Sequence, residues 1–447
     1  MKRQAPGPGM LEFMHGVRKH GFLDLIGKLW REHGDVFQVR IGTRTLVFAM
    51  HPDAVEHVNI SQKHKYDKRA SYDGLRKFLL REGLIVSTGD LWRRQRKLMA
   101  PFYTPKGVQA YAELMVRDAA RLLERWGTLS NTGAEVEIAE EMTMVTASII
   151  LNAMFSTEKM ESILEVQEAA QTIISFSSER LTGIPLPVWL PTEKNRKYIE
   201  ARKFVQKIIS ELITKRRATD ESQWPDDLLS RLMKARDEET GQAMSEQLLH
   251  DESMTIYFAG HETTARTMTF AWYALAMNPK VTERLHEELD RVLGGRLPTV
   301  EDMRKLPYTL QVVKEVLRVY PPAPFYARDA VADDELGGYH VPAGASIMLS
   351  PYYTHRHPKF WETPEVFDPE RFTREREAAR HAHAYHPFAT GQRICLGNNF
   401  SLLETHLLLA ILASRFKPRL RPGYSPRWEM RGTLGLANGL PMTIAAR

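Results

Sequence analysis

One ten-residue segment near the C-terminal end, FATGQRICLG at 388–397, contains the only cysteine among the 447 residues. A helix-favouring run follows at once, so the Cys395 sulfur is expected near a helix N-terminus, where free amides and the helix dipole favour an anion. Gly391 permits a tight turn and Gly397 a close backbone approach, while Arg393 offers a permanent cation to an anionic group. The segment would suit an anionic, ring-bearing metal cofactor. The alternative is a buried structural cysteine beside an ordinary helix start.

The same segment resembles the haem-binding signature of the cytochrome P-450 family, Phe-x-x-Gly-x-Arg-x-Cys-x-Gly, at every fixed position. The resemblance implies haem b as cofactor, with Cys395 as the axial ligand of its iron. It also implies that Arg393 pairs with a haem propionate and that Phe388 packs beneath the ring beside the sulfur. Gly391 and Gly397 are expected to shape this cofactor-binding loop. A thiolate ligand pushes electron density onto the iron and favours O–O cleavage.

A long helix is predicted over about 246–277, because Ser245 is a good N-cap and Asn278-Pro279 ends the helical pattern. Its middle carries the sequence AGHETT at 259–264, which places polar groups after an apolar run, where burial is costly unless function compensates. AGHETT resembles the I-helix signature of the same family. A zinc helix His-Glu-x-x-His is the rival interpretation, and it fails because Ala265 occupies the second histidine position.

The I-helix resemblance assigns roles to four residues of this segment. Small side chains at Ala259 and Gly260 would leave room for dioxygen as co-substrate. Thr263 would hydrogen-bond in the oxygen-binding region and help to deliver protons, and Glu262 would relay protons from solvent. Glu262 and Thr263 are therefore the candidate catalytic residues.

Three further residues are candidates for binding the haem propionates. Trp92 and Arg96 stand four residues apart on one helix face, and this spacing occurs in the family's C helix. A solvated basic helix face is the alternative. Arg328 lies at about the distance from the Glu-x-x-Arg motif at which many family members carry a propionate-binding arginine.

The Glu-x-x-Arg motif itself is Glu315 with Arg318, on a helix predicted from Leu306 to Tyr320. With Arg371 of the later Pro-Glu-Arg-Phe segment, it resembles a buried cluster that fixes the fold rather than the chemistry. The histidines between 381 and 386 lie in a charged loop, and we expect them to be exposed to solvent.

Several short strands are predicted around these motifs. They are a hairpin over 36–50, two strands near 325–330 and 346–352 that flank a Gly337-Gly338 turn, and a terminal hairpin between 430 and 444. Three prolines within 183–191 forbid a helix there, and its apolar residues indicate either a substrate-entry lid or a loop packed onto the surface.

The expected fold is mainly α with a small β-sheet region (α+β), of the cytochrome P-450 type. No Ser/Gly-rich tract, long charge run or repeat marks a linker, so we expect a single large domain over 1–447, with 1–30 as an N-terminal lead. The hydrophobic fraction of 43% is sufficient for a large core around a cofactor.

The net charge of +6 comes from dispersed basic residues without a nucleic-acid-binding motif, so an acidic protein partner explains it better than nucleic acid. A single cysteine excludes an internal disulfide and favours a reducing cytoplasm. No stretch reaches eighteen uninterrupted apolar residues, and we therefore expect a soluble, cytoplasmic monomer without a transmembrane anchor.

The predicted activity is haem-thiolate monooxygenation of an apolar small molecule, such as a fatty acid or terpenoid, by hydroxylation or epoxidation. No dinucleotide fingerprint occurs in the sequence, so electrons derived from NAD(P)H must come from a ferredoxin or flavodoxin-like donor with its reductase. Arg93, Arg94 and Lys97 could form part of its docking face, or simply a solvated helix face. The alternatives are a peroxide-using peroxygenase of the same fold and a non-catalytic haem protein that binds a ligand. Neither would need Glu262 and Thr263.

Overall fold

The computed structural model describes residues 3–156, 160–182, 187–237 and 240–447. Its contacts divide the chain into two compact units, each assembled from three separate stretches. The first unit comprises Met1–Asp73, Lys314–Cys395 and Trp428–Gly435; the second comprises Gly74–Val313, Leu396–Arg427 and Leu436–Arg447. The prediction of one domain over the whole chain stays a prediction.

The first unit contains a five-stranded sheet with the order β1-β2-β8-β5-β3. Its strands are β1 (Val36–Ile41), β2 (Arg44–Ala49), β3 (Tyr66–Asp67), β5 (Tyr326–Ala330) and β8 (Ser346–Leu349). The β1–β2 hairpin and the strands β5 and β8 lie where the sequence predicts them. β2 pairs with β8 in parallel, whereas the other neighbours are antiparallel.

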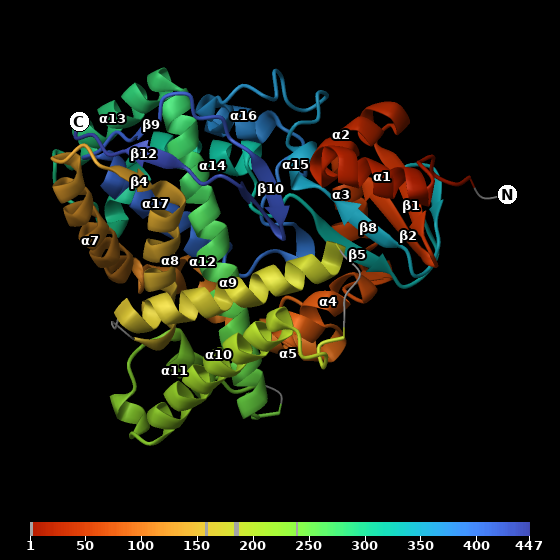
Figure 1. Cartoon of the computed structure of the whole chain (residues 1–447), viewed down its shortest axis with the longest axis horizontal. Helices are drawn as coiled ribbons and strands as arrows, with labels where there is room; N and C mark the ends of the chain where they lie inside the picture. Colours follow the sequence, from red (N-terminus) through yellow and green to blue (C-terminus); the bar gives the residue numbers. More distant parts are fainter. Residues whose placement is uncertain (1–2, 157–159, 183–186, 238–239) are drawn as a thin grey trace. The chain divides into compact units, whose positions relative to one another are not determined.

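Two helices that the sequence does not predict, α1 (Met10–His20) and α2 (Phe22–His33), lie beside β1 (Figure 1). The N-terminal lead over 1–30 is therefore largely helical. Gly21, with φ +80°, ends α1 by donating its N–H to the Val17 carbonyl oxygen at 2.9 Å. The stacked rings of Phe37 and Phe48, 5.0 Å apart, form the centre of the core between these helices and the sheet.

The remaining elements of the first unit are short. Its helices are α3 (Pro52–Glu56), α15 (Pro351–Thr354) and α16 (Arg374–Ala379), and its hairpins are β6 (Asp334–Leu336) with β7 (Tyr339–Val341) and β10 (Trp428–Arg431) with β11 (Thr433–Leu436). The predicted Gly337-Gly338 turn joins β6 to β7. The predicted terminal hairpin over 430–444 is only partly correct, because β10 and β11 turn at Gly432 and the following strand pairs elsewhere.

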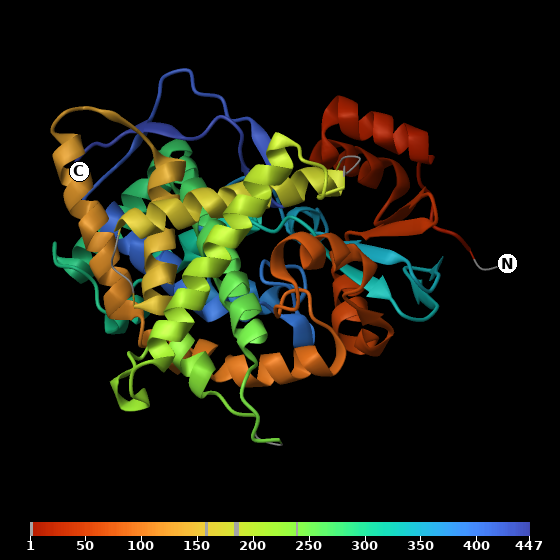
Figure 2. The ribbon, with the colours of Figure 1, turned by 60° about the horizontal axis from the view of Figure 1, so that its bottom comes forward.

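The second unit is mainly helical. Its helices are α5 (Gly89–Met99), α6 (Pro105–Gln109), α7 (Ala112–Ser130), α8 (Ile138–Phe155), α9 (Met160–Thr182), α10 (Glu193–Arg217), α11 (Leu228–Lys234), α12 (Glu246–Met277), α13 (Pro279–Leu293) and α17 (Asn398–Ala413). α9 and α10 lie side by side (Figures 1 and 2). A three-stranded sheet completes the unit, in the order β4 (Glu135–Glu137), β12 (Pro441–Thr443) and β9 (Arg419–Leu420). Two helices continue from one unit into the other along the chain, α4 (Asp73–Leu75) and α14 (Pro307–Val319).

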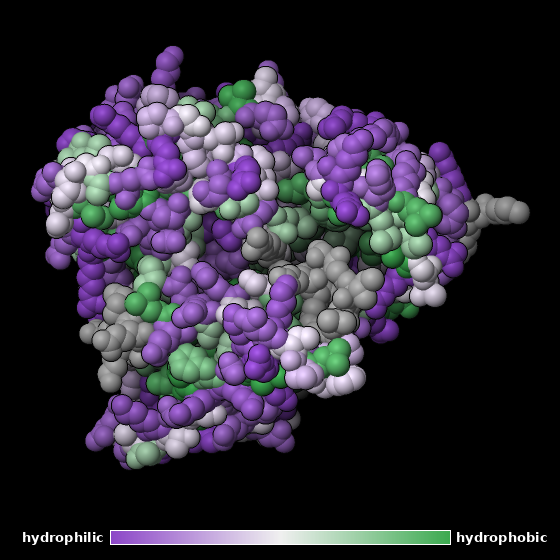
Figure 3. Space-filling view, in the orientation of Figure 1, coloured by the Kyte–Doolittle hydropathy of each residue, from purple (hydrophilic) through white to green (hydrophobic). Residues whose placement is uncertain are grey.

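The 32-residue helix α12 lies among the other helices of this unit and packs most extensively against α8. It begins after Ser245, whose side chain accepts the Leu248 N–H, and it ends before Asn278, which matches the range predicted from the sequence. Among the described residues, only α8 is long and apolar enough to cross a membrane, and 78% of it is buried, as in the core helix of a globular protein. The face shown in Figure 3 is largely hydrophilic, with hydrophobic side chains in scattered patches.

Candidate active site

The cysteine loop, residues 388–397, is closed by a backbone hydrogen bond from the Cys395 N–H to the Phe388 carbonyl oxygen at 2.9 Å. Gly391 has φ +70°, and a Cβ there would lie 2.3 Å from the Asn59 carbonyl oxygen, so both the turn and the packing require glycine. A Cβ at Gly397 would meet no protein atom within 4 Å. Cys395 is exposed and stands three residues before the first residue of α17, where the helix dipole favours a thiolate.

Arg393 and Arg328 lie in the first unit and line one small cavity. The Arg393 side chain is 8% exposed, and its Nη2 donates to Asp67 Oδ1 at 2.8 Å. Burial lowers the pKa of Arg393 to about 10. Arg328 is buried, stacks over the Tyr326 ring and donates to the Ala327 carbonyl oxygen at 2.8 Å. The structure therefore brings together two of the predicted propionate-binding arginines.

In the second unit, the centre of α12 holds the candidate catalytic pair. The Thr263 hydroxyl donates to the Ala259 carbonyl oxygen at 2.8 Å. Glu262 is partly exposed, and its carboxylate lies 3.8 Å from Arg266 one turn later. A Cβ at Gly260 would lie 2.8 Å from Ile150 Cγ1, so close packing of α12 against α8 by itself requires glycine here.

Trp92 and Arg96 occupy one face of α5, with Trp92 buried and Arg96 half-buried. Asp90 lies in the first turn of α5, which begins after Thr88, and pairs with Arg93. Arg94 also has a carboxylate neighbour, Asp237 at 3.9 Å. Two of the three basic residues proposed for partner docking are thus already near acidic side chains.

The chain was compared with known proteins. The family model for Cytochrome P450 matches residues 3–442. Cyclooctatin synthase of Streptomyces melanosporofaciens is 34% identical over 92% of this chain and 89% of its own length. Cyclooctat-9-en-7-ol 5-monooxygenase of the same organism is 35% identical over 88% of this chain and 84% of its own length. The crystal structure of the cytochrome P450DA heme domain superposes with a TM-score of 0.91 at 26% identity, covering 100% of this chain and 99% of that one.

The chain belongs to the cytochrome P450 family. It is a haem-thiolate monooxygenase of mainly α fold with small sheets, as the sequence predicts. The predicted fold class and enzyme class are therefore confirmed.

Reasoning from the sequence missed one residue whose position in this P450 suits a haem. Burial lowers the pKa of Lys68 well below its ordinary value, and the neighbouring charges of Arg328 and Arg393 lower it further. Lys68, Arg328 and Arg393 therefore form a cluster of basic side chains in which the charge of Lys68 is disfavoured, with Asp67 as a nearby carboxylate. Such a cluster suits the anionic propionates of a haem. Lys68 stands in a stretch with several other basic residues, so no sequence signal distinguishes it.

Two buried acids of the second unit were also missed. Glu252 on α12 has no exposed surface, and burial raises its pKa to about 8. Glu404 on α17 has no hydrogen-bond partner for either carboxyl oxygen within the described ranges. Burial raises its pKa well above the ordinary value, while the nearby Thr264 hydroxyl lowers it. A glutamate inside the apolar run 400–413 is a signal that could have revealed Glu404.

The predicted solvent exposure of the histidines between 381 and 386 is wrong for His386. This side chain is 1% exposed, and burial lowers its pKa to about 3. Its backbone N–H donates to His355 Nε2 at 2.8 Å, which draws the end of the loop inward. His261 is a packed bystander, as the sequence indicates: it is buried, and its Nδ1 lies 2.9 Å from the Tyr257 carbonyl oxygen.

Within the described residues, one group of potential metal ligands lies within 4.8 Å of one another: Asp35, His51 and His357. The Nδ1 atoms of His51 and His357 accept the N–H groups of Asp53 and Lys359. His357 Nε2 lies 3.1 Å from Asp35 Oδ1, and the His51 ring packs 5.3 Å from the His357 ring. Asp35 and His357 thus form a hydrogen-bonded pair beside His51.

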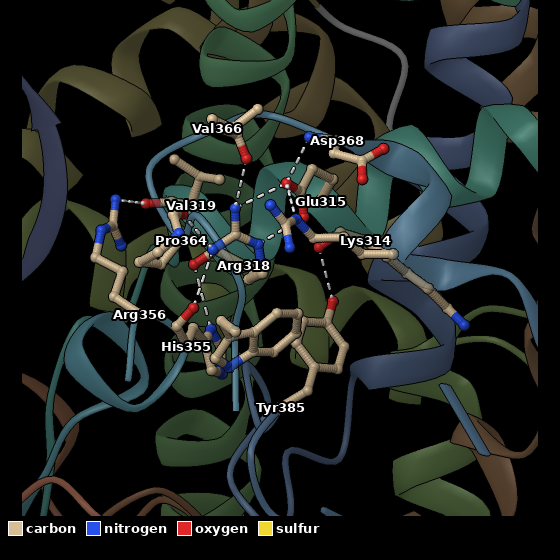
Figure 4. A network of polar contacts seen from close by, with 12 residues as sticks. Lys314, Glu315, Arg318, Val319, His355, Arg356, Pro364, Val366, Asp368 and Tyr385 are labelled. Atoms are coloured by element: carbon tan, nitrogen blue, oxygen red, sulfur yellow. Dashed lines mark hydrogen bonds and ion pairs between the residues drawn. The ribbon is translucent and has the colours of Figure 1, made fainter. Parts of the chain in front are cut away.

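The predicted fold cluster of Glu315, Arg318 and Arg371 lies in the first unit and is buried. Figure 4 shows Glu315 and Arg318 within their network of polar contacts. Arg318 makes two bonds to Glu315, at 2.7 and 2.8 Å, and Arg371 lies 3.6 Å from the same carboxylate. Arg318 also donates to three carbonyl oxygens, those of His355, Pro364 and Val366. The cluster thus ties α14 to the chain segment that leads to the cysteine loop.

Proposed function

We propose that this P450 hydroxylates or epoxidises an apolar, terpenoid-like small molecule. One relative is named for oxygenating cyclooctat-9-en-7-ol, and it matches most of this chain. The bound haem would supply dioxygen activation, with one oxygen atom entering a C–H or C=C bond and the other leaving as water. We also propose that electrons come from NAD(P)H through a ferredoxin or flavodoxin-like protein with its reductase, since no dinucleotide fingerprint occurs in these 447 residues.

The observation that supports this proposal best is the acid–alcohol pair on α12. Glu262 is partly exposed, so it can exchange protons with solvent, and its carboxylate lies 3.8 Å from Arg266. Thr263 Oγ1 donates its proton to the Ala259 carbonyl oxygen, so its lone pairs stay available to accept another hydrogen bond. Glu262 can therefore exchange a proton with solvent, and the Thr263 oxygen can accept a hydrogen bond in the middle of the helix, as a proton relay needs.

The residues proposed to hold the cofactor are assigned by role. Cys395 would provide the axial sulfur, Phe388 would pack beneath the ring, and Gly391 and Gly397 would shape the loop. Ala259 and Gly260 would border the dioxygen site. The side chains proposed for the two propionates are Trp92, Arg96, Arg328 and Arg393, to which the structure adds Lys68.

The deciding experiment supplies reduced nicotinamide cofactor, surrogate redox proteins, labelled dioxygen and a panel of cyclic terpenoids. Wild-type protein should incorporate label into product, and Thr263→Ala should divert about tenfold more reducing equivalents to hydrogen peroxide by losing proton delivery. Thr269→Ala is the matched control, because Thr269 makes the same type of hydroxyl bond to Ala265 one and a half turns later. Unchanged coupling in Thr263→Ala would contradict the proton-delivery role.

The same assay separates the two alternatives. A peroxygenase would turn over with hydrogen peroxide alone as fast as with the redox proteins, and a ligand-binding haem protein would form no product under either condition. The reduced carbon monoxide complex checks the ligand assignment, because Cys395→Ala should abolish the thiolate-type absorption band.

The proposal also includes the location of the enzyme, its oligomeric state and its electron donor. We expect a soluble cytoplasmic monomer that meets an acidic electron donor through basic residues such as Lys97. The loop 183–191 is a candidate substrate lid, of which 183–186 lie outside the described residues. Trp189 in the described part is 79% exposed, which suits a surface loop.

A further inference from the structure

A cavity of about 280 Å³ lies in the second unit, where the end of α12, the start of α13 and the segment 416–420 meet. The last turns of α12, α13 and β9 lie side by side there (Figure 1). Trp272, which lines the cavity, follows Thr263 by nine residues, or about 14 Å along the helix axis. The cavity is therefore separate from the oxygen-binding region proposed at the middle of α12.

The floor of this cavity is apolar but carries one unused hydrogen-bond donor. Leu275 and Phe416 line it together with Trp272, whose side chain is 2% exposed and packs 5.5 Å from the Trp126 ring. The Trp272 indole N–H has no acceptor in the part of the chain that the structure describes.

The rim of the cavity is basic. Lys417 and Arg419 line it, and neither has a carboxylate within ion-pair distance among the described residues. Burial, together with the charges of Arg447 and Lys417, lowers the pKa of His286, another lining residue, to about 4. The nearby carboxylate of Asp290 is paired with Arg447. The potential at the cavity is therefore positive at neutral pH, with His286 uncharged.

We propose that this cavity binds a small amphipathic monocarboxylate, such as a medium-chain fatty acid. Its apolar body would occupy the floor beside Leu275 and Phe416, and its carboxylate would lie near Lys417 and Arg419. The volume lies just below the usual range for small-molecule pockets, roughly 300–1,000 Å³, which excludes a two-chain lipid. This inference does not depend on the proposed terpenoid substrate.

Photolabelling of the holoprotein locates such a site. The probes are a diazirine-bearing decanoic acid and the matching decanol, followed by peptide mapping. The acid should label peptides from 272–286 and 416–420 about fivefold more than the alcohol does, because only the acid can pair with the basic rim. Equal labelling by acid and alcohol, or no labelling of these peptides, would overturn the proposal.

Variants test the basic rim of the site. Lys417→Gln/Arg419→Gln should lower labelling by the acid about fivefold, whereas the matched control Arg421→Gln should not, because Arg421 pairs with Glu135 and does not line the cavity. If the double variant labels like Arg421→Gln, the carboxylate is not held at this rim.

A cavity-filling variant distinguishes a blocked site from loss of labelling caused by misfolding. Ala276 lines the cavity and is half-buried, so Ala276→Phe should block labelling by both probes. The Soret shift produced by ligands of the haem pocket should stay as in wild type, which shows that the fold is retained. Labelling that persists in Ala276→Phe would place the probe elsewhere and refute the assignment.

Discussion

Glu252 shows how one buried carboxyl group can make stability depend on pH. Its Oε2 accepts the Leu84 N–H at 3.2 Å, and its Oε1 has no partner within the described residues. Burial raises its pKa from 4.5 to about 8, the Leu84 bond opposes the shift, and the charge of Asp251 adds to it. At pH values between these two pKa values, Glu252 keeps its proton in the folded protein and releases it in the unfolded chain. Folding stability therefore falls as pH rises from about 4.5 to 8, and the loss is complete above pH 8.

Glu252→Gln should remove this dependence, since the amide is neutral and still offers an oxygen to Leu84. We expect thermal stability equal to wild type near pH 5 and higher by a few kcal/mol at pH 8, measured by thermal unfolding across this range. Glu246→Gln on the same helix is the control, because Glu246 is 57% exposed. A pH-independent difference between Glu252→Gln and wild type would contradict the assigned titration.

A second prediction at the residue scale concerns Arg393, which is held by Asp67 beside Arg328 and Lys68. If it pairs with a haem propionate, Arg393→Leu should weaken haem retention without abolishing it, because a charge-assisted hydrogen bond contributes about 1.5–3 kcal/mol and other cations remain. Arg96→Leu should act in the same direction, and Arg328→Leu should have the smallest effect of the three.

The measurement is pyridine haemochrome per protein after mild denaturant. Arg376→Leu serves as the control, since Arg376 is 56% exposed and pairs with Asp368 in the same unit. Haem retention in Arg393→Leu that matches Arg376→Leu would show that the propionates are anchored by other residues.

At the scale of elements, α14 is fixed by the buried cluster of Glu315, Arg318 and Arg371. The Glu315 and Arg318 side chains are 0% exposed, and Glu315 also accepts the Asp368 backbone N–H at 2.8 Å. Removing one member of a buried ion pair leaves the other charge without compensation, at a cost of about 3–5 kcal/mol. The cluster therefore stabilises the path of the chain from α14 to the cysteine loop.

Glu315→Gln should accordingly lower the free energy of unfolding by about 3–5 kcal/mol, seen as a lower denaturant midpoint. Lys314→Gln is a matched control one residue away, because the Lys314–Glu377 pair is partly exposed and should cost less than about 1 kcal/mol. Similar midpoints for the two variants would mean that the buried cluster does not carry this stability.

At the scale of the whole molecule, local signals in the sequence were sufficient to predict the elements whose ends are marked by a cap or turn residue. Ser245 and Pro279 bound α12, and the Gly337-Gly338 turn locates the β6–β7 hairpin. The cysteine loop was recognised because its fixed residues are close together in sequence. Features that depend on partners far along the chain were missed, such as the burial of His386 against His355.

The N-terminal helices α1 and α2 were missed although both carry helix signals of their own: an acidic residue in the first turn, basic residues in the last turn and a glycine at the C-cap. The buried charges illustrate the limit of local signals. Lys68 joins Arg328 and Arg393 only through pairing of β3 with β5, a contact between residues more than 250 positions apart. Strand pairing over such separations has no local sequence signature.

The last prediction concerns cooperativity. The chain passes from one compact unit to the other five times, so neither unit is a continuous piece of sequence. Unfolding of either unit would free the ends of segments that the other must hold in place, and we therefore expect both to unfold together, as the single-domain prediction requires. Calorimetry of the holoprotein should give one transition with equal calorimetric and van't Hoff enthalpies. Two separate transitions, or a protease-resistant fragment containing Gly74–Val313 that outlasts the first unit, would contradict a single cooperative domain.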